Sequence, residues 1–210
     1  FPKSIRISSR RGLNDYKKNK LLVSFLERII DNKINYYMVN SDAVKRELRE
    51  EKIEKERITC IKNGIQINNK LNFKKIDYKV RKSLNISKNK IIISCVANLI
   101  PYKGHKELIE ILSLLKTQEK KKLTILFIGK ELGRREELIN FASENNLGTE
   151  LQILGSQKNI FEYIISSNIM TLLPTRNESL SNSILESMAF KKPSIVSDIG
   201  GNKELIKNSK

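Results

Sequence analysis

Residues 174–201 read PTRNESLSNSILESMAFKKPSIVSDIGG, and the rest of the chain is interpreted from this stretch. Its apolar residues recur at helical spacing and predict an amphipathic helix over residues 180–190, packed on a sheet. They are Ile184, Leu185, Met188 and Ala189. Two carboxylates accompany this helix: Glu178 precedes it, and Glu186 lies about two turns inside it.

Small polar residues at the start of a helix leave backbone N–H groups free and place the positive end of the helix dipole beside any bound anion. The stretch therefore suggests a phosphate-bearing ligand whose hydroxyl groups bind the two carboxylates. A second interpretation is purely structural. Ser183-Ile-Leu-Glu186 fits a capping box, in which Glu186 would only satisfy backbone donors at the helix start. Spacing alone does not decide between the two.

Residues 77–210 alternate regularly between short apolar runs and amphipathic segments. Apolar strands of four to seven residues separated by helices indicate a parallel sheet covered on both faces, so an α/β, doubly wound, Rossmann-like domain is predicted. The strands are expected at 90–96, 122–128, 150–154, 168–173 and 194–197, and the other helices at 78–84, 103–116, 133–145, 159–166 and from 203 onward. Ligands of such sheets bind beyond the carboxyl ends of the strands.

The first part of the chain shows a shorter alternation of the same kind. Strands are expected at 4–8, 36–39 and 57–61, a helix at 16–33, and a helix from Asp42 to about Glu51 that Ser41 caps. Asn63-Gly64 is a turn-forming dipeptide, and the residues that follow, up to Ile76, are polar and irregular. We therefore expect a partial Rossmann-like domain over 1–63, a linker over 64–76 and a second domain over 77–210.

The segment from Glu178 to Gly201 resembles the E-x(7)-E signature of the retaining family 4 glycosyltransferases, the glycogen-synthase-like group 1 enzymes with the GT-B fold of two Rossmann-like domains. The match includes the two glutamates, the small-Met-Ala run, Lys192-Pro193 and the final glycine pair. The resemblance implies that residues 1–63 are the end of the N-terminal, acceptor-side domain. Residues 77–210 would be the nucleotide-sugar donor domain, truncated at its end.

The resemblance also implies roles for the two carboxylates and their loop. Glu178 would meet hydroxyls of the donor sugar, and Glu186 would accept from the ribose 2′ and 3′ hydroxyls, as an acceptor-only carboxylate suits a vicinal diol. The backbone N–H groups of Leu180 and Ser181 would face sugar and phosphate. Ser179 stands where the family commonly carries glycine, which leaves less room for close backbone approach.

Other strand ends carry further candidate residues. Lys103-Gly104 at a helix start places a cation beside free N–H groups, and in the family this lysine contacts the donor diphosphate; the alternative is a surface lysine. Asn98 stands where relatives often have arginine. In the later loop, Ser156 and Gln157 would lie near the nucleobase. Lys103 and Glu178 are the predicted catalytic residues, and Glu178 positions the sugar rather than acting as nucleophile.

Composition permits a competing interpretation. The 210 residues carry a net charge of +17, which could attract nucleic acid, anionic lipid or an acidic substrate. A non-catalytic basic module would bind with a steep salt dependence that ignores both glutamates. The lysines, however, are spread over every segment, and only 6% of residues are aromatic, without basic-aromatic interleaving, so we expect no nucleic-acid partner. Cys60 and Cys95 lie in apolar runs and are expected to be inert core thiols in a reducing compartment.

We therefore expect a cytoplasmic, metal-independent hexosyltransferase that needs no cofactor. It would move a sugar from a nucleotide-diphosphate donor to a glycan or lipid-linked acceptor in cell-surface polysaccharide synthesis. No Asp-x-Asp pair is present to hold a metal. The chain begins Phe-Pro and is expected to be a fragment that turns over no acceptor alone. Basic helix 16–33 would either contact the inner face of the membrane or pack into the core with one solvated face.

Overall fold

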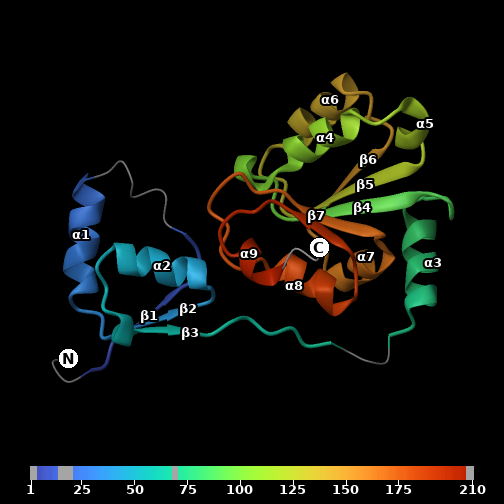
Figure 1. The fold of residues 1–210 in the computed structure, drawn as a ribbon. Helices are drawn as coiled ribbons and strands as arrows, with labels where there is room; N and C mark the ends of the chain where they lie inside the picture. Colours follow the sequence, from blue (N-terminus) through green and yellow to red (C-terminus); the bar gives the residue numbers. More distant parts are fainter. Residues whose placement is uncertain (1–3, 14–20, 68–70, 207–210) are drawn as a thin grey trace. The chain divides into compact units, whose positions relative to one another are not determined.

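The computed structural model describes residues 4–13, 21–67 and 71–206, and Figure 1 shows their helices and strands. The chain divides into two compact units. The first consists of Phe1–Gly64, Arg176–Ser181 and Asp198–Lys210, and the second of Ile65–Thr175 and Asn182–Ser197. The first unit thus includes two segments that the sequence analysis assigned to the C-terminal domain.

The first unit is built on a parallel three-stranded sheet in the order β1-β2-β3. Its strands are β1 (Ile7–Arg10), β2 (Tyr36–Val39) and β3 (Ile58–Cys60), with helices α1 (Leu21–Asp31) and α2 (Asp42–Glu50) and the 3-10 turn η2 (Lys55–Arg57). Strand β1 begins later than the expected residue 4, because its partner β2 begins only at Tyr36, opposite Ile7. The predicted cap of α2 is confirmed: Ser41 Oγ accepts the Val44 N–H at 3.2 Å.

The two faces of this sheet differ. Tyr37 and Val39 point into a core that α2 completes with Val44 and Leu48. The alternate residues of β2 are exposed, as is Ile7 on β1, so in the described residues one face of the sheet is left open. Apolar side chains of α1 are exposed as well: Leu22, Leu26, Ile29 and Ile30. Within the described residues these four side chains do not pack into a core, unlike in the core-packing alternative, and the membrane alternative stays a prediction. Residues 16–20 of the predicted helix lie outside the described residues.

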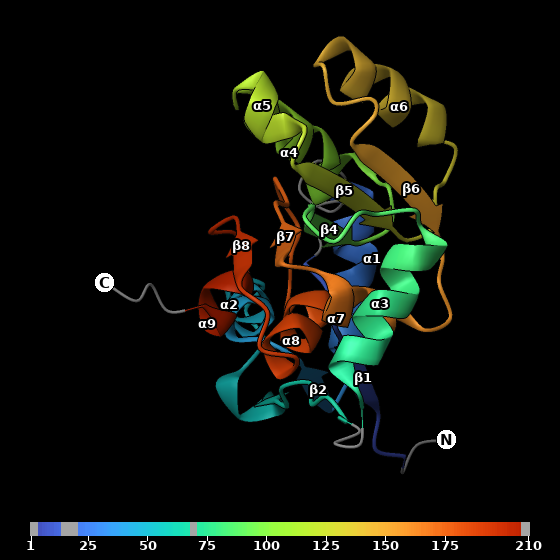
Figure 2. The same ribbon diagram turned by 90° about the vertical axis from the view of Figure 1, so that its right-hand side faces the viewer.

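The second unit has a parallel five-stranded sheet in the order β6-β5-β4-β7-β8 (Figure 2). The strands are β4 (Ile91–Val96), β5 (Leu123–Ile128), β6 (Leu151–Gly155), β7 (Ile169–Leu172) and β8 (Ser194–Val196). From central β4 the chain moves outward to β5 and β6, then crosses to the other side of β4 for β7 and β8. The order reverses between β4 and β7, which makes their carboxyl ends the topological switch point of the sheet.

Helices cover both faces of this sheet, which confirms the predicted α/β, doubly wound architecture. On one side α4 (His105–Ser113) packs beside α6 (Arg135–Glu144); on the other α7 (Ile160–Ser166) packs beside α3 (Phe73–Ser83) and α8 (Asn182–Ala189). The short helix α5 (Thr117–Lys120) also belongs to this unit, whereas the short helix α9 (Asn202–Leu205) belongs to the first unit. Every residue of β5 is buried, as expected for a parallel strand covered on both faces.

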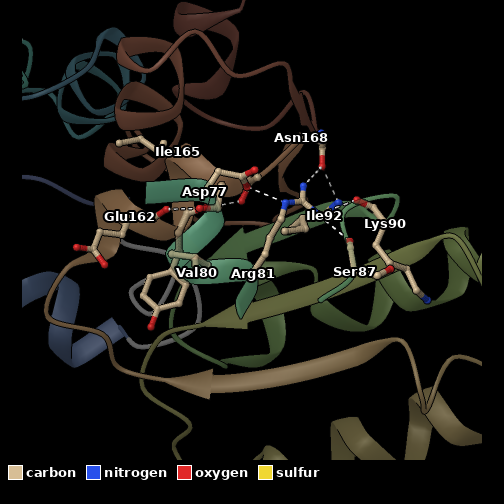
Figure 3. Close-up of polar contacts among 12 residues, drawn as sticks. Asp77, Val80, Arg81, Ser87, Lys90, Ile92, Glu162, Ile165 and Asn168 are labelled. Atoms are coloured by element: carbon tan, nitrogen blue, oxygen red, sulfur yellow. Dashed lines mark hydrogen bonds and ion pairs between the residues drawn. The ribbon is translucent and has the colours of Figure 1, made fainter. Parts of the chain in front are cut away.

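Arg81 on α3 anchors that helix to the amino ends of β4 and β7 (Figure 3). Its guanidinium donates to Asp77 at 2.7 Å, to the Lys90 carbonyl at 3.0 Å and to Asn168 Oδ1 at 3.2 Å. The same Asn168 oxygen accepts the Ile92 N–H at 2.9 Å. Helix α3 begins at Phe73, within the segment expected to be a linker, because the Asn72 side chain caps it by accepting the Lys75 N–H.

Candidate active site

The connection from β4 to α4 brings a lysine to an uncapped helix start. Residues Pro101–Lys103 form the 3-10 turn η3, and Gly104 takes a left-handed conformation (φ +83°) before α4 begins at His105. The helix therefore starts later than the expected residue 103. Gly104 has no side chain with which to cap the helix, so the first N–H groups of α4 are available to a ligand. Half-buried Lys103 stands immediately before them.

Gly104 also lies hard against the end of β7. A Cβ atom placed on Gly104 would come 2.0 Å from the Leu173 carbonyl oxygen. In addition, the Thr175 N–H donates to the Tyr102 carbonyl at 2.9 Å. The connections that follow β4 and β7 are thus held together beside the switch point, and no residue larger than glycine fits at 104.

Asn98 links the β4 connection to the one after β5. Its Oδ1 accepts the Lys130 N–H at 3.1 Å, and the Leu99 N–H donates to the Lys130 carbonyl at 2.8 Å. The exposed Asn98 amide therefore supports a loop. Any contact of Asn98 with a donor would use the NH₂ end of the amide.

Glu186 is half-buried on α8, and burial raises the pKa of its carboxyl. The capping-box interpretation is wrong, because α8 begins at Asn182. Ser183 is then inside the helix rather than at its cap, and Glu186 lies beyond the third helical position that a capping box requires. Within the described parts of the chain, the Glu186 carboxylate has no hydrogen bond or ion pair, so its acceptor capacity is available to a ligand.

The loop of Glu178 belongs to the first unit and is buried there. Residues Glu178, Ser179, Leu180 and Ser181 are each less than one-tenth exposed. Ser179 Oγ donates to the Arg11 carbonyl at 2.7 Å, and the Glu178 carbonyl accepts the Gly201 N–H at 3.1 Å. Ser179 at the family's glycine position thus has a partner within the unit. Lys103 and Glu186 lie in the second unit, so the binding of one ligand by these two residues together with Glu178 stays a prediction.

Ser156 and Gln157 follow β6, at the same edge of the second sheet. Ser156 is exposed. The Gln157 amide is engaged at both ends: its Nε2 donates to the Leu154 carbonyl at 2.7 Å, and its Oε1 accepts the Tyr163 hydroxyl at 2.9 Å. Gln157 therefore retains limited capacity for the predicted contact with a nucleobase.

His105 is fully buried at the start of α4, with its ring edge-on to Phe127 at 4.8 Å between centroids. Burial, with smaller contributions from the Arg134 and Lys103 cations, lowers the pKa of His105 to about 4, so the ring is neutral at pH 7. The sequence contained a signal for this burial. His105 shares the helical spacing of the buried residues Leu108, Ile109 and Leu112.

A charged cluster on α4 and α6 was missed by the sequence analysis. The Glu137 carboxylate accepts hydrogen bonds from Arg134 Nε and Nη2 at 2.7 and 2.9 Å, and it forms an ion pair with Lys106 Nζ at 2.7 Å. The Arg134 guanidinium, followed by the Lys106 ammonium, lowers the pKa of Glu137 to about 2. The spacing of Arg134 and Glu137 on one helical turn was the available signal.

The described residues contain neither a metal-binding group nor a helix that could span a membrane. No group of three or more His, Cys, Asp or Glu side chains there is placed to hold a metal ion. No helix in 4–13, 21–67 or 71–206 is both long and apolar enough to cross a membrane. Cys60 lies half-buried in β3 and Cys95 buried in β4.

In doubly wound sheets of this kind, ligands bind at the switch point, where this chain has a lysine and two helix starts. Residues 77–210 match the model of the family "Glycosyl transferases group 1", so the chain belongs to this family of glycosyltransferases. The match covers the second unit from residue 77 onward, together with the segments Arg176–Ser181 and Asp198–Lys210 of the first unit. A comparison with curated protein sequences gave no match.

Solved structures show the same fold over nearly the whole chain. Anabaena HepE, solved with UDP and glucose, matches with a TM-score of 0.86 and 20% identity over 96% of this chain and 55% of HepE. A glycosyltransferase from Rickettsia africae matches with a TM-score of 0.75 and 23% identity over 96% of this chain and 54% of its own. S. aureus TarM matches with a TM-score of 0.70 and 18% identity over 97% of this chain and 39% of its own. The fold is that of the GT-B glycosyltransferases, and the chain spans about half the length of the first two.

Proposed function

We propose that this chain binds the donor in a retaining hexosyltransferase, which moves a sugar from a nucleotide diphosphate to a glycan or lipid-linked acceptor in cell-surface polysaccharide synthesis. One observation carries the proposal. Lys103 with the uncapped start of α4 follows β4, and α8 follows the neighbouring strand β7 at the switch point. Helix α8 carries Glu186, whose carboxylate has no partner among the described residues. The solved complexes of HepE with UDP and with UDP-glucose support a nucleotide-sugar donor.

The diphosphate would lie at the start of α4. Free N–H groups of the helix and the Lys103 ammonium offer fixed positive potential where negative charge grows as the diphosphate departs. Gly104 permits the close approach of backbone and ligand. Each such helix-end interaction contributes about 0.3–1 kcal/mol when exposed and up to about 2 kcal/mol when partly buried.

The two glutamates would bind the hydroxyl groups of the donor. Glu186 has the free acceptor capacity that the ribose 2′ and 3′ hydroxyls require, and Glu178 would position the sugar together with the N–H groups of the loop after it. That loop contains Ser179, Leu180 and Ser181. Ser156 and Gln157 would lie beside the nucleobase, and Asn98 would hold the loops that frame the diphosphate.

The proposed reaction needs no covalent enzyme intermediate and no metal. The acceptor oxygen attacks the anomeric carbon from the face that the diphosphate leaves, so the new glycosidic bond forms on the side where the bond to phosphate breaks. The acceptor proton passes to the departing phosphate oxygen. Lys103 and the helix dipole stabilise the charge that develops there, and Glu178 holds the sugar in place.

A thermal-shift screen of uridine, guanosine and adenosine diphosphate sugars would identify the donor, and calorimetric titration would then test the residues. We expect Lys103→Ala and Glu186→Ala to weaken donor binding about tenfold or more, because each removes a charged partner of the ligand. Lys122→Ala and Glu144→Ala are matched controls, with the same charge changes at exposed positions away from the switch point. No binding of any nucleotide by the folded chain would contradict the proposal.

A membrane contact through the predicted helix 16–33 is proposed for the same enzyme. It is supported by the apolar side chains that α1 exposes, with Leu22 at 79% and Leu26 at 58%, by Arg28 on the same helix and by the net charge of +17. Leu22→Asp/Leu26→Asp should abolish flotation with anionic liposomes, whereas Leu114→Asp, at an 85% exposed position of the second unit, should not. Equal flotation of both variants, or of the chain with neutral liposomes, would contradict this contact.

A further inference from the structure

Arg134 is held in an unusual way for an arginine in a surface connection. The two residues before it, Leu132 (φ +50°) and Gly133 (φ +77°), both have left-handed backbone conformations, which for leucine costs about 1 kcal/mol. The turn delivers Arg134 to the start of α6 with its side chain only 14% exposed. The strained turn is thus followed by an arginine whose side chain is largely buried.

The partners of Arg134 tie it to the first turn of α4. Its Nε and Nη2 donate to the two oxygens of Glu137 at 2.7 and 2.9 Å. Lys106, the second residue of α4, reaches the same Glu137 carboxylate at 2.7 Å. The fork leaves Nη1 of Arg134 without a hydrogen bond in the portion of the chain that the structure describes. This N–H₂ group can still bind an anion.

The charges around this helix start do not cancel. Arg134, Lys106 and Lys103 bring three positive charges, whereas Glu137 and Glu107, which lies in the first turn of α4, bring two negative charges. Between Lys103 and Lys106 in the sequence lies His105, which is fully buried. Arg134 and Lys103 both act electrostatically on His105, which shows that both cations lie near one residue of the uncapped helix start.

The strand arrangement places these groups on neighbouring connections. Strands β4 and β5 pair in register to their last residues, Val96 opposite Ile128. Lys103 follows β4 and Arg134 follows β5, and the backbones of the two connections are joined through Lys130. A diphosphate at the start of α4 carries more negative charge than one lysine neutralises, and Asn98 between them is a neutral amide.

We propose that Arg134 is a second cationic binding residue for the donor diphosphate, acting with Lys103 from the other side of the α4 N-terminus. This inference rests on the proposed function, because it takes its ligand from there. Glu137 and Lys106 then have a positioning role: they hold the guanidinium so that Nη1 faces the anion. The expected contact is one charge-assisted hydrogen bond to a phosphate oxygen.

The test compares Arg134→Gln with Arg135→Gln. The adjacent Arg135 forms an equivalent fork with Glu131, at 2.7 Å for each contact, so the control removes the same charge and the same type of ion pair one residue away. Affinities for a nucleoside, its monophosphate and its diphosphate are measured by calorimetry. Arg134→Gln should weaken diphosphate binding about tenfold and leave nucleoside binding unchanged, and Arg135→Gln should change neither.

Arg134→Lys keeps the charge but not the fork, and its diphosphate affinity should lie between those of the wild type and Arg134→Gln. Thermal melts of Arg134→Lys and of the wild type should agree, so that a difference in their diphosphate affinities reflects binding and not a loss of the fold. Wild-type affinity for the diphosphate together with equal affinities of Arg134→Gln and Arg135→Gln would overturn this inference alone. A wild-type chain that binds no nucleoside diphosphate would overturn both this inference and the proposed function.

Discussion

Replacing Gly104 by alanine tests the junction that places Lys103 at the start of α4. Two costs add at this position. A left-handed conformation costs a residue with a Cβ about 1–2 kcal/mol, and the new Cβ would overlap the Leu173 carbonyl, 2.0 Å away. The overlap cannot be relieved without moving backbone, so we expect a total loss of about 3–5 kcal/mol in the free energy of unfolding of the second unit.

Gly133→Ala separates the two costs. Gly133 has nearly the same backbone conformation, φ +77° against +83°, but a Cβ there would meet no atom within 4 Å. It should lose only the conformational part, about 1–2 kcal/mol. In urea denaturation followed by circular dichroism, the midpoint of Gly104→Ala should therefore be about 1 M lower than that of Gly133→Ala, if the slope is about 2 kcal/mol per M. Equal midpoints would refute the close approach of Gly104 to β7.

Three further predictions concern stability. The pKa of histidine is about 6.5 in the unfolded chain and about 4 for folded His105, so between these pH values the unfolded chain binds more protons. The free energy of unfolding should therefore fall by about 3 kcal/mol as pH drops from 7 to 4. In urea titrations at each pH, His105→Leu should lack this part of the pH dependence. A dependence unchanged by the substitution would refute the buried neutral ring. Arg81→Met should cost about 1–3 kcal/mol, because Asp77 loses its ion-pair partner and the Lys90 carbonyl loses a hydrogen bond. Donor affinity should stay within about twofold by calorimetry, since Arg81 lies at the opposite sheet edge; a large loss of affinity would argue against this separation. Ser41→Ala should destabilise the first unit by about 1 kcal/mol in chemical denaturation, and no change would contradict its capping role.

The second unit could be predicted largely from the sequence. Its strands are apolar runs buried on both faces, and each predicted strand from β4 to β8 is present within about two residues of its expected limits. The alternation of strands and helices then restricted the topology, because crossovers between parallel strands are right-handed. The place of Lys103 after β4, and that of Glu186 on the helix after β7, followed from that topology.

Other features depend on tertiary contacts that no local pattern encodes. The apolar stripe of α1 predicted burial, but periodicity reveals which face is apolar and not what covers it, and Leu22 and Leu26 are exposed. The loop of Glu178 joins the first unit through Ser179 and Gly201, contacts between residues distant in sequence. The Arg134 cluster bridges α4 and α6 in the same way.

The start of α8 shows how a shift of two residues in a helix start changes an interpretation. Ser183 and Glu186 satisfied the capping-box spacing, and the sequence could not tell whether the helix began before or after Ser183. Because the helix begins at Asn182, Glu186 is free of that role. Helix limits are the least certain part of any pattern, and here the limit removes the structural role of Glu186, while its binding of a ligand stays a prediction.

A crystal structure of the chain with the nucleotide-diphosphate sugar selected by the thermal-shift screen would test the central claim most directly. Our account predicts that the diphosphate lies at the start of α4 within hydrogen-bond distance of Lys103, with both ribose hydroxyls on the Glu186 carboxylate. A nucleotide bound away from the carboxyl ends of β4 and β7, or one whose ribose does not contact Glu186, would contradict it.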